Sequence, residues 1–381
     1  MESTLHLDEY IAGIKGTGTG YKYFIPEKVN RQWLWDDPNL NHLLEKASLQ
    51  IGQLNSYARL VPNIDLFLHM HIMKEAVLSS KIEGTQTQID EALLPIEDIS
   101  PERRDDWQEV NNYTIALNDA IEDLKTLPIS SRLIRKTHAT LLQGVRGEHK
   151  QPGEFRYSQN WIGGASLNDA VFIPPAHSYV NELMGDLENF LHNDEITVPY
   201  LIRIGIAHYQ FETIHPFLDG NGRIGRLLIP LYLVSVGMLD KPLLYLSVFF
   251  EKDKTLYYDN LTRVRDKNTL KHWLLYFLVG LEETAKQACE TLSKILELKN
   301  ECEHLVSEKM GKRSSKGQVL LKSLFNEPFI RVKEIEKICG LSPKAANDLV
   351  QAFESEKILR EFTGQNRNRI YAFEKYLSLF R

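Results

Sequence analysis

The chain has 381 residues, of which 43% are hydrophobic and 25% charged, an ordinary composition for a folded protein of two or three domains. No run of about eighteen apolar residues occurs, and the first residues do not read as a secretory signal, so we expect neither a membrane span nor export. The three cysteines, at positions 289, 302 and 339, are too scattered for a disulfide framework or a metal site and indicate reduced thiols in the cytoplasm.

The net charge of −6 is unevenly distributed along the chain. Residues 312–381 carry 14 Lys and Arg against 8 Asp and Glu, so a basic C-terminal part follows an acidic body. This asymmetry indicates different partners for the two parts.

The first 35 residues contain closely spaced glycines between residues 13 and 20. No strand pattern precedes them and no helix pattern follows, so we expect a surface loop or an N-terminal arm and not a phosphate-binding loop.

Apolar residues at helical spacing predict helices over 39–61, 64–80, 105–124 and 128–142. The second of these ends in Ser79-Ser80-Lys81-Ile82-Glu83-Gly84, where Gly84 is a suitable helix stop. A negative charge in the last turn of a helix is unfavourable, so the position of Glu83 calls for a cation nearby.

Residues 144–175 are rich in glycine and proline, with strand-like pieces at 155–157 and 171–173, and they predict a hairpin over a cleft. Helices are predicted over 179–192, 199–214 and 223–237. Pro230 should kink the last of these or displace its start. One or two long helices are predicted over 269–310.

Between two of these helices lies the run His-Pro-Phe-Leu-Asp-Gly-Asn-Gly-Arg-Ile-Gly-Arg, residues 215–226. It predicts a loop that ends on a helix N-terminus, where free backbone N–H groups and the helix dipole bind anions. Gly220 and Gly222 allow close approach of the backbone, and Asn221 tolerates a left-handed conformation. Arg223 and Arg226 are one helical turn apart, so both can face one phosphate chain.

Two further side chains of this run add chemistry to the anion site. Asp219 offers an oxygen ligand to Mg²⁺, which commonly uses one or two carboxylates together with substrate phosphates. His215 has the side chain whose ordinary pKa lies near neutrality and is a natural general base. Phe217 would anchor the loop in the core. The run therefore predicts phosphoryl-group chemistry.

The basic C-terminal part begins after a polar stretch, residues 311–315. Three helices are predicted, the third capped by Ser342-Pro343 after Gly340, followed by strands around a turn at 364–368. This order resembles a winged helix-turn-helix. The side chains that could contact DNA, with a protein partner as the alternative, are Lys344, Asn347, Gln351, Arg367 and Arg369.

The run from His215 to Arg226 resembles the signature of Fic-domain proteins, which are largely adenylyltransferases that move AMP from ATP to a protein hydroxyl. The resemblance implies a mainly α fold: a Fic-type helical core with a small β-hairpin flap, followed by a winged-helix domain. The expected divisions are an N-terminal helical region with an inhibitory helix (1–110), the catalytic core (111–270), connecting helices (271–311) and the winged-helix domain (312–381).

The resemblance also implies roles for individual residues. Ser79 to Gly84 resembles the family's inhibitory motif, so that Ser79, Glu83 and Gly84 are inhibitory and Glu83 pairs with Arg226 where the γ-phosphate of ATP would lie. Within residues 144–175, a Gly-x-Arg followed by Ile173-Pro174-Pro175 resembles the flap that docks the target protein. The implied catalytic residues are His215, Asn221 and Arg226. The implied nucleotide-binding residues are Glu83, Phe217, Asp219, Gly220, Asn221, Gly222, Arg223, Arg226, Tyr257 and Tyr258. Asp219 is the implied Mg²⁺ ligand, while Arg265 stands near the place of an asparagine found in some relatives and leaves the adenine contacts open.

These features predict an autoinhibited protein adenylyltransferase that uses ATP and Mg²⁺, modifies a Ser, Thr or Tyr hydroxyl and releases pyrophosphate. A homodimer and self-modification are also expected from the resemblance. One alternative is removal of AMP by the same site, with Glu83 orienting a water. Another is a DNA-binding transcription regulator that uses the core only as a nucleotide sensor. Transfer of phosphate is disfavoured because the Gly-Asn-Gly-Arg loop is intact.

Overall fold

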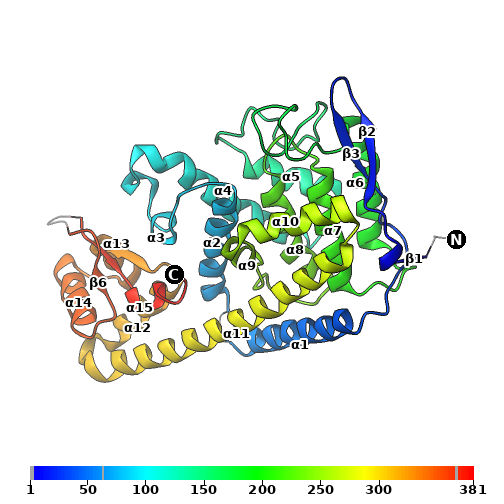
Figure 1. Ribbon diagram of the computed structural model, residues 1–381. Helices are drawn as coiled ribbons and strands as arrows, with labels where there is room; N and C mark the ends of the chain where they lie inside the picture. The colour runs from blue at the N-terminus through cyan, green and yellow to red at the C-terminus, as the bar shows by residue number, and fades with distance from the viewer. Residues whose placement is uncertain (1–3, 62–63, 365–367) are drawn as a thin grey trace.

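The computed structural model describes residues 4–61, 64–364 and 368–381, most of them helical. A helical body is followed by a smaller C-terminal unit, residues 314–381, which sits at the end of one long helix (Figure 1). The α-helices of the body are α1 (Pro38–Leu60), α2 (Asp65–Ile82), α3 (Ile89–Ala92), α4 (Arg104–Asp123), α5 (Ser131–Leu141), α6 (His177–His192), α7 (Tyr200–Ile214), α8 (Asn221–Ser235), α9 (Ser247–Lys252), α10 (Lys254–Lys267) and α11 (Leu270–Lys309). In the part of the chain that the structure describes, no helix is long and apolar enough to cross a membrane.

The long predicted helices of the body are confirmed, and local capping explains where several of them begin. The side chain of Asp37 accepts hydrogen bonds from the first turn of α1, with Pro38 at the first helical position. Ser130 accepts a bond from the N–H of Leu133 at the start of α5. The segment predicted as one or two helices, 269–310, is the single helix α11 of 40 residues.

Helix α7 is the centre of the body, because residues 201–214 are all buried. It packs against α6, α8 and α11. Gly205 permits the close approach of α11, since a Cβ atom there would lie 2.9 Å from the side chain of Leu274. Trp273 of α11 donates a hydrogen bond to the carbonyl of Gly205 at 2.8 Å. The loop between α7 and α8, residues 215–220, therefore follows a helix that is buried along residues 201–214.

Helix α8 differs from the prediction in its start and in the effect of Pro230. It begins at Asn221, not at residue 223, and it continues through Pro230 to Ser235. Proline lacks an N–H group, so one backbone hydrogen bond of this helix is missing, and the helix nevertheless continues across it.

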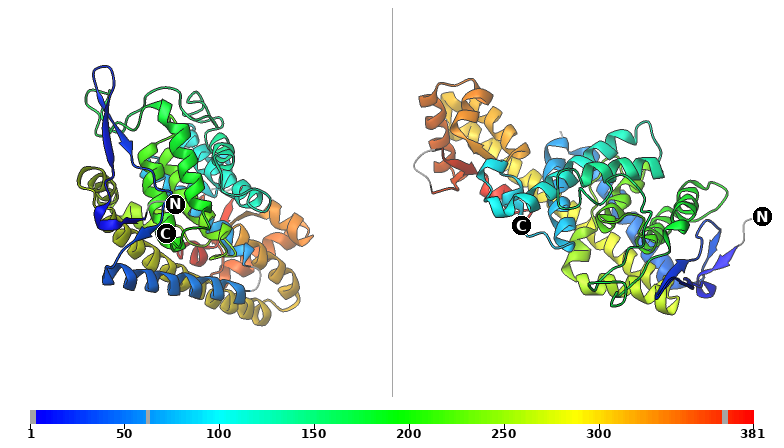
Figure 2. Two further views of the ribbon diagram at one scale, coloured as in Figure 1. Left: turned by 90° about the vertical axis from the view of Figure 1, so that its right-hand side faces the viewer. Right: turned by 90° about the horizontal axis from the view of Figure 1, so that it is seen from above.

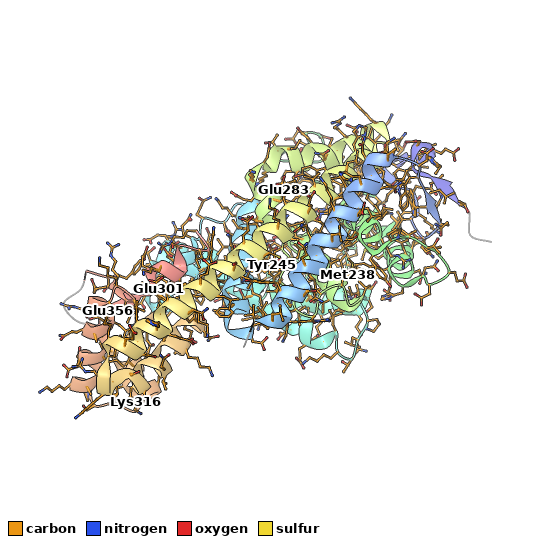
Figure 3. All side chains as sticks on the ribbon, turned by 90° about the horizontal axis from the view of Figure 1, so that it is seen from below. Met238, Tyr245, Glu283, Glu301, Lys316 and Glu356 are labelled. Carbon is orange, nitrogen blue, oxygen red and sulfur yellow. The ribbon has the colours of Figure 1, made fainter. Side chains whose placement is uncertain are left out.

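The predicted domain boundaries also need correction. The boundary between residues 110 and 111 falls in the middle of α4, which is one continuous helix. The expected connecting helices, 271–311, begin inside the body, because the first half of α11 packs on α7. Figure 3 shows α11 running past Glu283 and Glu301 toward the C-terminal unit, with α1 alongside its first part.

The N-terminal residues are not the irregular arm that the glycines suggested. Strands β2 (Gly13–Thr17) and β3 (Lys22–Pro26) form an antiparallel hairpin, and β1 (Leu5–His6) pairs with β4 (Trp33–Leu34) in parallel. Gly16 lies in β2, opposite Tyr23 of β3. A Cβ atom at residue 16 would lie 2.4 Å from the ring of Tyr23, so glycine makes room for that ring. The N–H of Phe24 donates to the carbonyl of Ile173 at 2.9 Å, so the hairpin supports the segment predicted as a flap.

The predicted hairpin and flap segment, residues 144–175, lies at the same end of the body but contains less strand than expected. Residues 155–157 are not a strand, and the described residues here form a single isolated bridge between Ile162 and Phe172. The reason is that side chains hold this segment: Arg156 and Gln159 donate hydrogen bonds to its carbonyl groups.

The C-terminal unit contains three main helices and a three-stranded antiparallel sheet in the order β5-β7-β6. Its elements are α12 (Ser314–Asn326), β5 (Phe329–Arg331), α13 (Val332–Cys339), α14 (Pro343–Ser355), β6 (Arg360–Glu361), β7 (Ile370–Ala372) and α15 (Glu374–Leu377). The predicted helix stop at Gly340 and the cap at Ser342 are confirmed. Strand β5 was not predicted, and Arg367 lies outside the described residues. Figure 2 shows the C-terminal unit and the β2–β3 hairpin at opposite ends of the molecule.

Candidate active site

The run from His215 to Arg226 forms the loop between α7 and α8, as predicted. His215 ends α7 in a left-handed conformation with φ of 50°, and its N–H donates to the carbonyl of Phe211. Gly220 precedes α8 with φ of 73°. Within the described residues no side chain caps the N-terminus of α8, so its first N–H groups remain available to an anion.

Two residues that were expected to contact the nucleotide instead support the loop from inside. The side chain of Asn221 accepts from the N–H of Phe217 at 2.8 Å and donates to its carbonyl at 2.9 Å. The ring of Phe217 is fully buried and stacks on His138, with centroids 3.7 Å apart and planes at 7°. Phe217 is therefore the predicted core anchor and not a ligand contact, and Asn221 shapes the loop.

The flap segment holds the same loop from the other side. Arg156 is buried and donates to the carbonyls of His215, Pro175 and Ile214 at 2.9, 2.6 and 3.2 Å. Asn160 donates to the carbonyls of His215 and Phe217 at 3.1 and 2.8 Å. Asn160 was not predicted as a site residue, and Arg156 was noticed only as part of a strand-like piece.

Arg223 does not point freely at a phosphate chain. Its Nη1 donates to Glu109 at 2.9 Å, and its side chain is 5% exposed. A second contact, 3.6 Å long, joins Arg223 to Asp219. Glu109 also binds Arg146 at 2.9 Å. Arg223 thus ties the loop to α4, a role that sequence reasoning missed because Glu109 lies more than a hundred residues upstream.

Arg226 pairs with the end of α2, as the resemblance implied. Its Nη2 donates to Oε1 of Glu83 at 2.6 Å and to the carbonyl of Ser79 at 2.9 Å. Its Nε donates to Oγ of Ser79 at 2.9 Å. Burial disfavours the charged forms of both partners, but the ion pair outweighs it, lowering the pKa of Glu83 and raising that of Arg226. The cation that Glu83 required is Arg226.

A cavity of about 430 Å³ opens beside this ion pair. Its walls come from α2, the flap, the end of α7, the start of α8 and α10. The residues lining it include Gly222 and the polar residues Glu83, Glu212, His215, Tyr258 and Arg265. Two buried atoms near it, Nη1 of Arg226 and Oε1 of Glu212, have no hydrogen-bond partner among the described residues. An unpaired guanidinium donor beside a cavity suits a phosphate or another anion.

Of the two neighbouring tyrosines expected at the adenine, only one reaches the cavity. Tyr258 is 37% exposed and lines the cavity. Tyr257 is fully buried, and its hydroxyl lies 2.9 Å from Nε2 of His208. His208 uses Nδ1 to donate to the carbonyl of Gly225, so Nε2 accepts the tyrosine proton. Tyr257 belongs to the core.

Burial sets the protonation of the two titratable groups nearest the chemistry. It lowers the pKa of His215 to about 4, so its imidazole is neutral at pH 7 and can accept a proton. It raises the pKa of Glu212 to about 7 against the attraction of Arg226. Glu212 was missed from the sequence because it lies in an apolar helix with no motif around it.

Asp219 fits the predicted magnesium ligand. Its side chain is 44% exposed at the N-terminus of α8, and Oδ1 accepts the N–H of Gly220 at 2.6 Å. One exposed carboxylate beside a phosphate site is the donor set that Mg²⁺ uses together with substrate phosphates.

The fold and the site define a helical protein in which a glycine-containing loop ends at an uncapped helix N-terminus, and Arg226 of that helix pairs with the carboxylate of Glu83. Residues 41–122 match the family described as Fic/DOC family N-terminal, and residues 128–233 match the Fic/DOC family. The chain therefore contains a Fic N-terminal domain and a Fic domain.

Known relatives and one solved structure agree with this placement. The chain is 31% identical over 182 residues to the probable protein adenylyltransferase aq_aa38 of Aquifex aeolicus, covering 46% of this chain and 52% of that protein. It is 28% identical over 172 residues to the protein adenylyltransferase Fic of Drosophila erecta, covering 42% and 32%. The matches thus span about half or less of these relatives. A crystal structure of a Fic family protein from Desulfovibrio desulfuricans G20 has the same fold, with a TM-score of 0.57 at 20% identity, covering 89% of this chain and 96% of that one.

Proposed function

We propose that this chain is an autoinhibited protein adenylyltransferase that transfers AMP from ATP to a Ser, Thr or Tyr hydroxyl of a protein. The observation that carries the proposal is the placement of Arg226 and Glu83 as a pair beside the cavity that also holds His215. The names of the relatives from Aquifex aeolicus and Drosophila erecta support the reaction.

The residues of the site suit transfer of a nucleotidyl group. The ATP phosphates lie along the start of α8, where free N–H groups and Arg226 balance their charge. Nδ1 of His215 faces the carbonyl of Glu212 at 3.4 Å, so Nε2 accepts the proton of the target hydroxyl. The hydroxyl oxygen bonds to the α-phosphorus, the bond from that phosphorus to the bridging oxygen breaks, and pyrophosphate leaves.

Asp219 would hold Mg²⁺ together with phosphate oxygens, and the ion would supply positive charge to the phosphates. Gly222 leaves room for the inhibitory ion pair, because a Cβ atom there would meet both Glu83 and Arg226. The protein target is proposed to dock at the flap, beside exposed Trp161 and Val171.

Glu83 opposes the reaction because its carboxylate occupies the donor of Arg226 that a terminal phosphate would use. Substituting Glu83→Gly should therefore convert a nearly silent protein into an active one. The test follows AMP transfer from α-labelled ATP into protein by the wild type, Glu83→Gly and Glu83→Gly with His215→Ala. Activity confined to Glu83→Gly supports the proposal. Label from γ-labelled ATP instead would establish phosphate transfer, and activity without His215 would remove its role as the base.

Removal of AMP is a second candidate, because Glu83 and His215 line one cavity and the carboxylate could orient a water. Incubating AMP-modified target with the wild type tests it: release of AMP by the wild type, lost in Glu83→Gly, would support hydrolysis.

The C-terminal unit is proposed to be a winged-helix module, because its sheet and three helices follow that order. Exposed Lys344 and Gln351 on α14 would face DNA, with a protein partner as the alternative outcome. The free thiols of all three cysteines favour a cytoplasmic location. A gel-shift assay against random duplex DNA, with Lys344→Glu as the control, separates DNA binding from protein binding.

A further inference from the structure

His138 on α5 connects three parts of the site. It is fully buried and stacks on Phe217. Its Nδ1 accepts the N–H of Gly153 at 2.9 Å. An N–H group can only donate, so the ring proton must be on Nε2, which therefore donates to the carbonyl of Asp219 at 3.0 Å. Both nitrogens of the ring thus have fixed roles.

The bond to Asp219 decides which way the next peptide faces. In a planar trans peptide the carbonyl and the following N–H point in opposite directions. Because His138 draws the carbonyl of Asp219 toward the core, the N–H of Gly220 must point away from it. That N–H meets Oδ1 of Asp219 at 2.6 Å. Gly220 has φ of 73°, a conformation in which glycine meets little steric resistance.

We propose that His138 is a positioning residue for nucleotide binding. This proposal rests on the proposed function. His138 holds the peptide between Asp219 and Gly220 with the N–H toward Oδ1 of Asp219, and so fixes the carboxylate that would hold Mg²⁺. Stacking on Phe217 keeps the imidazole from turning. The motif run alone could not show this, since His138 lies 81 residues upstream of Asp219.

The test compares His138→Gln with His138→Asn, both in the Glu83→Gly background. Both variants lose the stacked ring, so both lose stability alike. The longer Gln side chain can place its NH₂ group near the former Nε2 and bond Asp219, whereas Asn reaches only the position of Nδ1. Affinity for Mg-ATP is measured by calorimetry below the melting temperature of each variant, together with the Mg²⁺ dependence of binding.

We expect Gln to bind Mg-ATP nearly as well as the parent and Asn to bind roughly 10- to 100-fold more weakly, the usual loss when a partner of a metal ligand is removed. Equal affinities of Gln and Asn would overturn the proposal. A parent that binds Mg-ATP but transfers no AMP would overturn the proposed function and leave this comparison valid. A parent that does not bind Mg-ATP would overturn both.

A separate set of contacts joins the inhibitory helix to the C-terminal unit. Phe67 of α2 packs edge-on against Phe325 of α12, with centroids 5.6 Å apart. One turn later His71 packs edge-on against Phe380, 5.2 Å away. The far end of the same helix carries Ser79, and Glu83 follows it directly. Figure 1 shows α2 between the body and the C-terminal unit.

The connector after Glu83 is tied to the same unit. Asp90 of α3 binds Arg381 at 2.9 Å, and Asp98 pairs with Arg331 of β5. A cavity of about 300 Å³ is lined by residues of α2, by residues 92–95 of the connector and by β5 of the C-terminal unit. The segment that carries Glu83 is therefore held by the C-terminal unit on both sides of the inhibitory residue.

From these contacts we infer that the C-terminal unit stabilises the inhibitory position of Glu83. This inference also rests on the proposed function. The test uses Phe380→Ala, which removes the contact with His71 near the chain end, and Phe362→Ala as a control. Phe362 is a 42% exposed aromatic of the same unit, and its ring packs edge-on against Phe329 of β5.

We expect Phe380→Ala to raise AMP transfer by roughly 2- to 30-fold, the range of couplings carried by packed networks. Phe362→Ala should leave the rate of the wild type unchanged. In the Glu83→Gly background Phe380→Ala should have no further effect, because the inhibitory carboxylate is already gone. Equal rates for Phe380→Ala and the wild type, or an equal increase in both backgrounds, would overturn the inference. Absence of transfer by Glu83→Gly itself would instead count against the proposed function.

Discussion

Oε1 of Glu83 accepts from Nη2 of Arg226 at 2.6 Å, although the two residues lie 143 positions apart in the chain. The side chain of Arg226 is 1% exposed, so its charge cannot be balanced by water. Any anion that takes the place of Glu83 must offer an equivalent acceptor at the same spot. A phosphate that binds Arg226 would therefore replace the carboxylate of Glu83 and not water, so its binding free energy is the difference between the two ion pairs.

Ser79 should contribute more to stability than its neighbour. Ser79→Ala removes the acceptor of Nε of Arg226 and leaves a buried guanidinium N–H unpaired, which costs about 1.5–3 kcal/mol of the free energy of unfolding. Ser80 is equally buried, but its hydroxyl has no partner within the described residues, so Ser80→Ala is the matched control with a smaller loss. Urea unfolding measures both. Equal losses would show that the bond to Arg226 adds nothing.

Gly222→Ala should lower the free energy of unfolding, mainly through a clash with Glu83. A Cβ atom at residue 222 would lie 2.3 Å from Oε1 of Glu83, closer than nonbonded atoms approach. We expect the substitution to lower the free energy of unfolding in the wild type and to lower it less in Glu83→Gly. The coupling in this double-mutant cycle should be roughly 0.5–3 kcal/mol, as for residues in contact. Additive losses would contradict the clash.

Glu212 should make stability depend on pH. Its folded-state pKa is about 7 against an ordinary 4.5, so the folded chain keeps a proton that the unfolded chain releases between these values. The associated stability is fully present below pH 4.5 and is lost as the pH rises through 7. Glu212→Gln mimics the neutral acid. Between pH 4.5 and pH 8 its free energy of unfolding should rise relative to that of the wild type by up to about 3 kcal/mol.

Thermal or urea unfolding of both proteins across this range gives the measurement for Glu212. Glu75 is a second buried carboxyl with a pKa raised to about 7, but it is present in both proteins and cancels in the difference. A difference that stays constant from pH 4.5 to pH 8 would show that Glu212 does not titrate there.

Substitution of Tyr257 should affect stability alone, whereas substitution of its neighbour Tyr258 should affect mainly ligand binding. Tyr257→Phe leaves Nε2 of buried His208 unpaired and should cost about 1–3 kcal/mol of the free energy of unfolding, with no change in ATP affinity. Tyr258→Ala should lower ATP affinity with little effect on stability, since Tyr258 lines the cavity. Both are measured in the Glu83→Gly background. Weaker ATP binding by Tyr257→Phe would restore the role that the resemblance implied.

The periodicity of apolar residues was sufficient to predict the helices, because burial of one face decides where a helix forms. The pairing of Glu83 with Arg226 was also predicted, through the resemblance and the unfavourable charge at the end of α2. The β2–β3 hairpin was missed because Gly16 was interpreted as a loop residue, whereas it makes room for the ring of Tyr23.

The supporting residues of the site could not be read from the sequence. Glu109 and His138 act on partners 114 and 81 positions away, and no local pattern marks such contacts. Nor does a motif distinguish a side chain that faces the ligand from one that faces inward. Phe217 and Tyr257 were therefore assigned to the nucleotide, although both are fully buried.

The position of α2 in the chain has a consequence for how the protein is made. A ribosome completes α2, with Ser79 and Glu83, before it begins α7 and α8. When Arg226 emerges, its inhibitory partner is already present, so the site is never assembled without it. Phe380, near the end of the C-terminal unit, is added 154 residues after Arg226 (380 − 226), or roughly 8 to 30 s later at ordinary rates of synthesis. During that interval the nascent chain holds the ion pair without the contacts of Phe325 and Phe380, which makes it the least restrained form of the site.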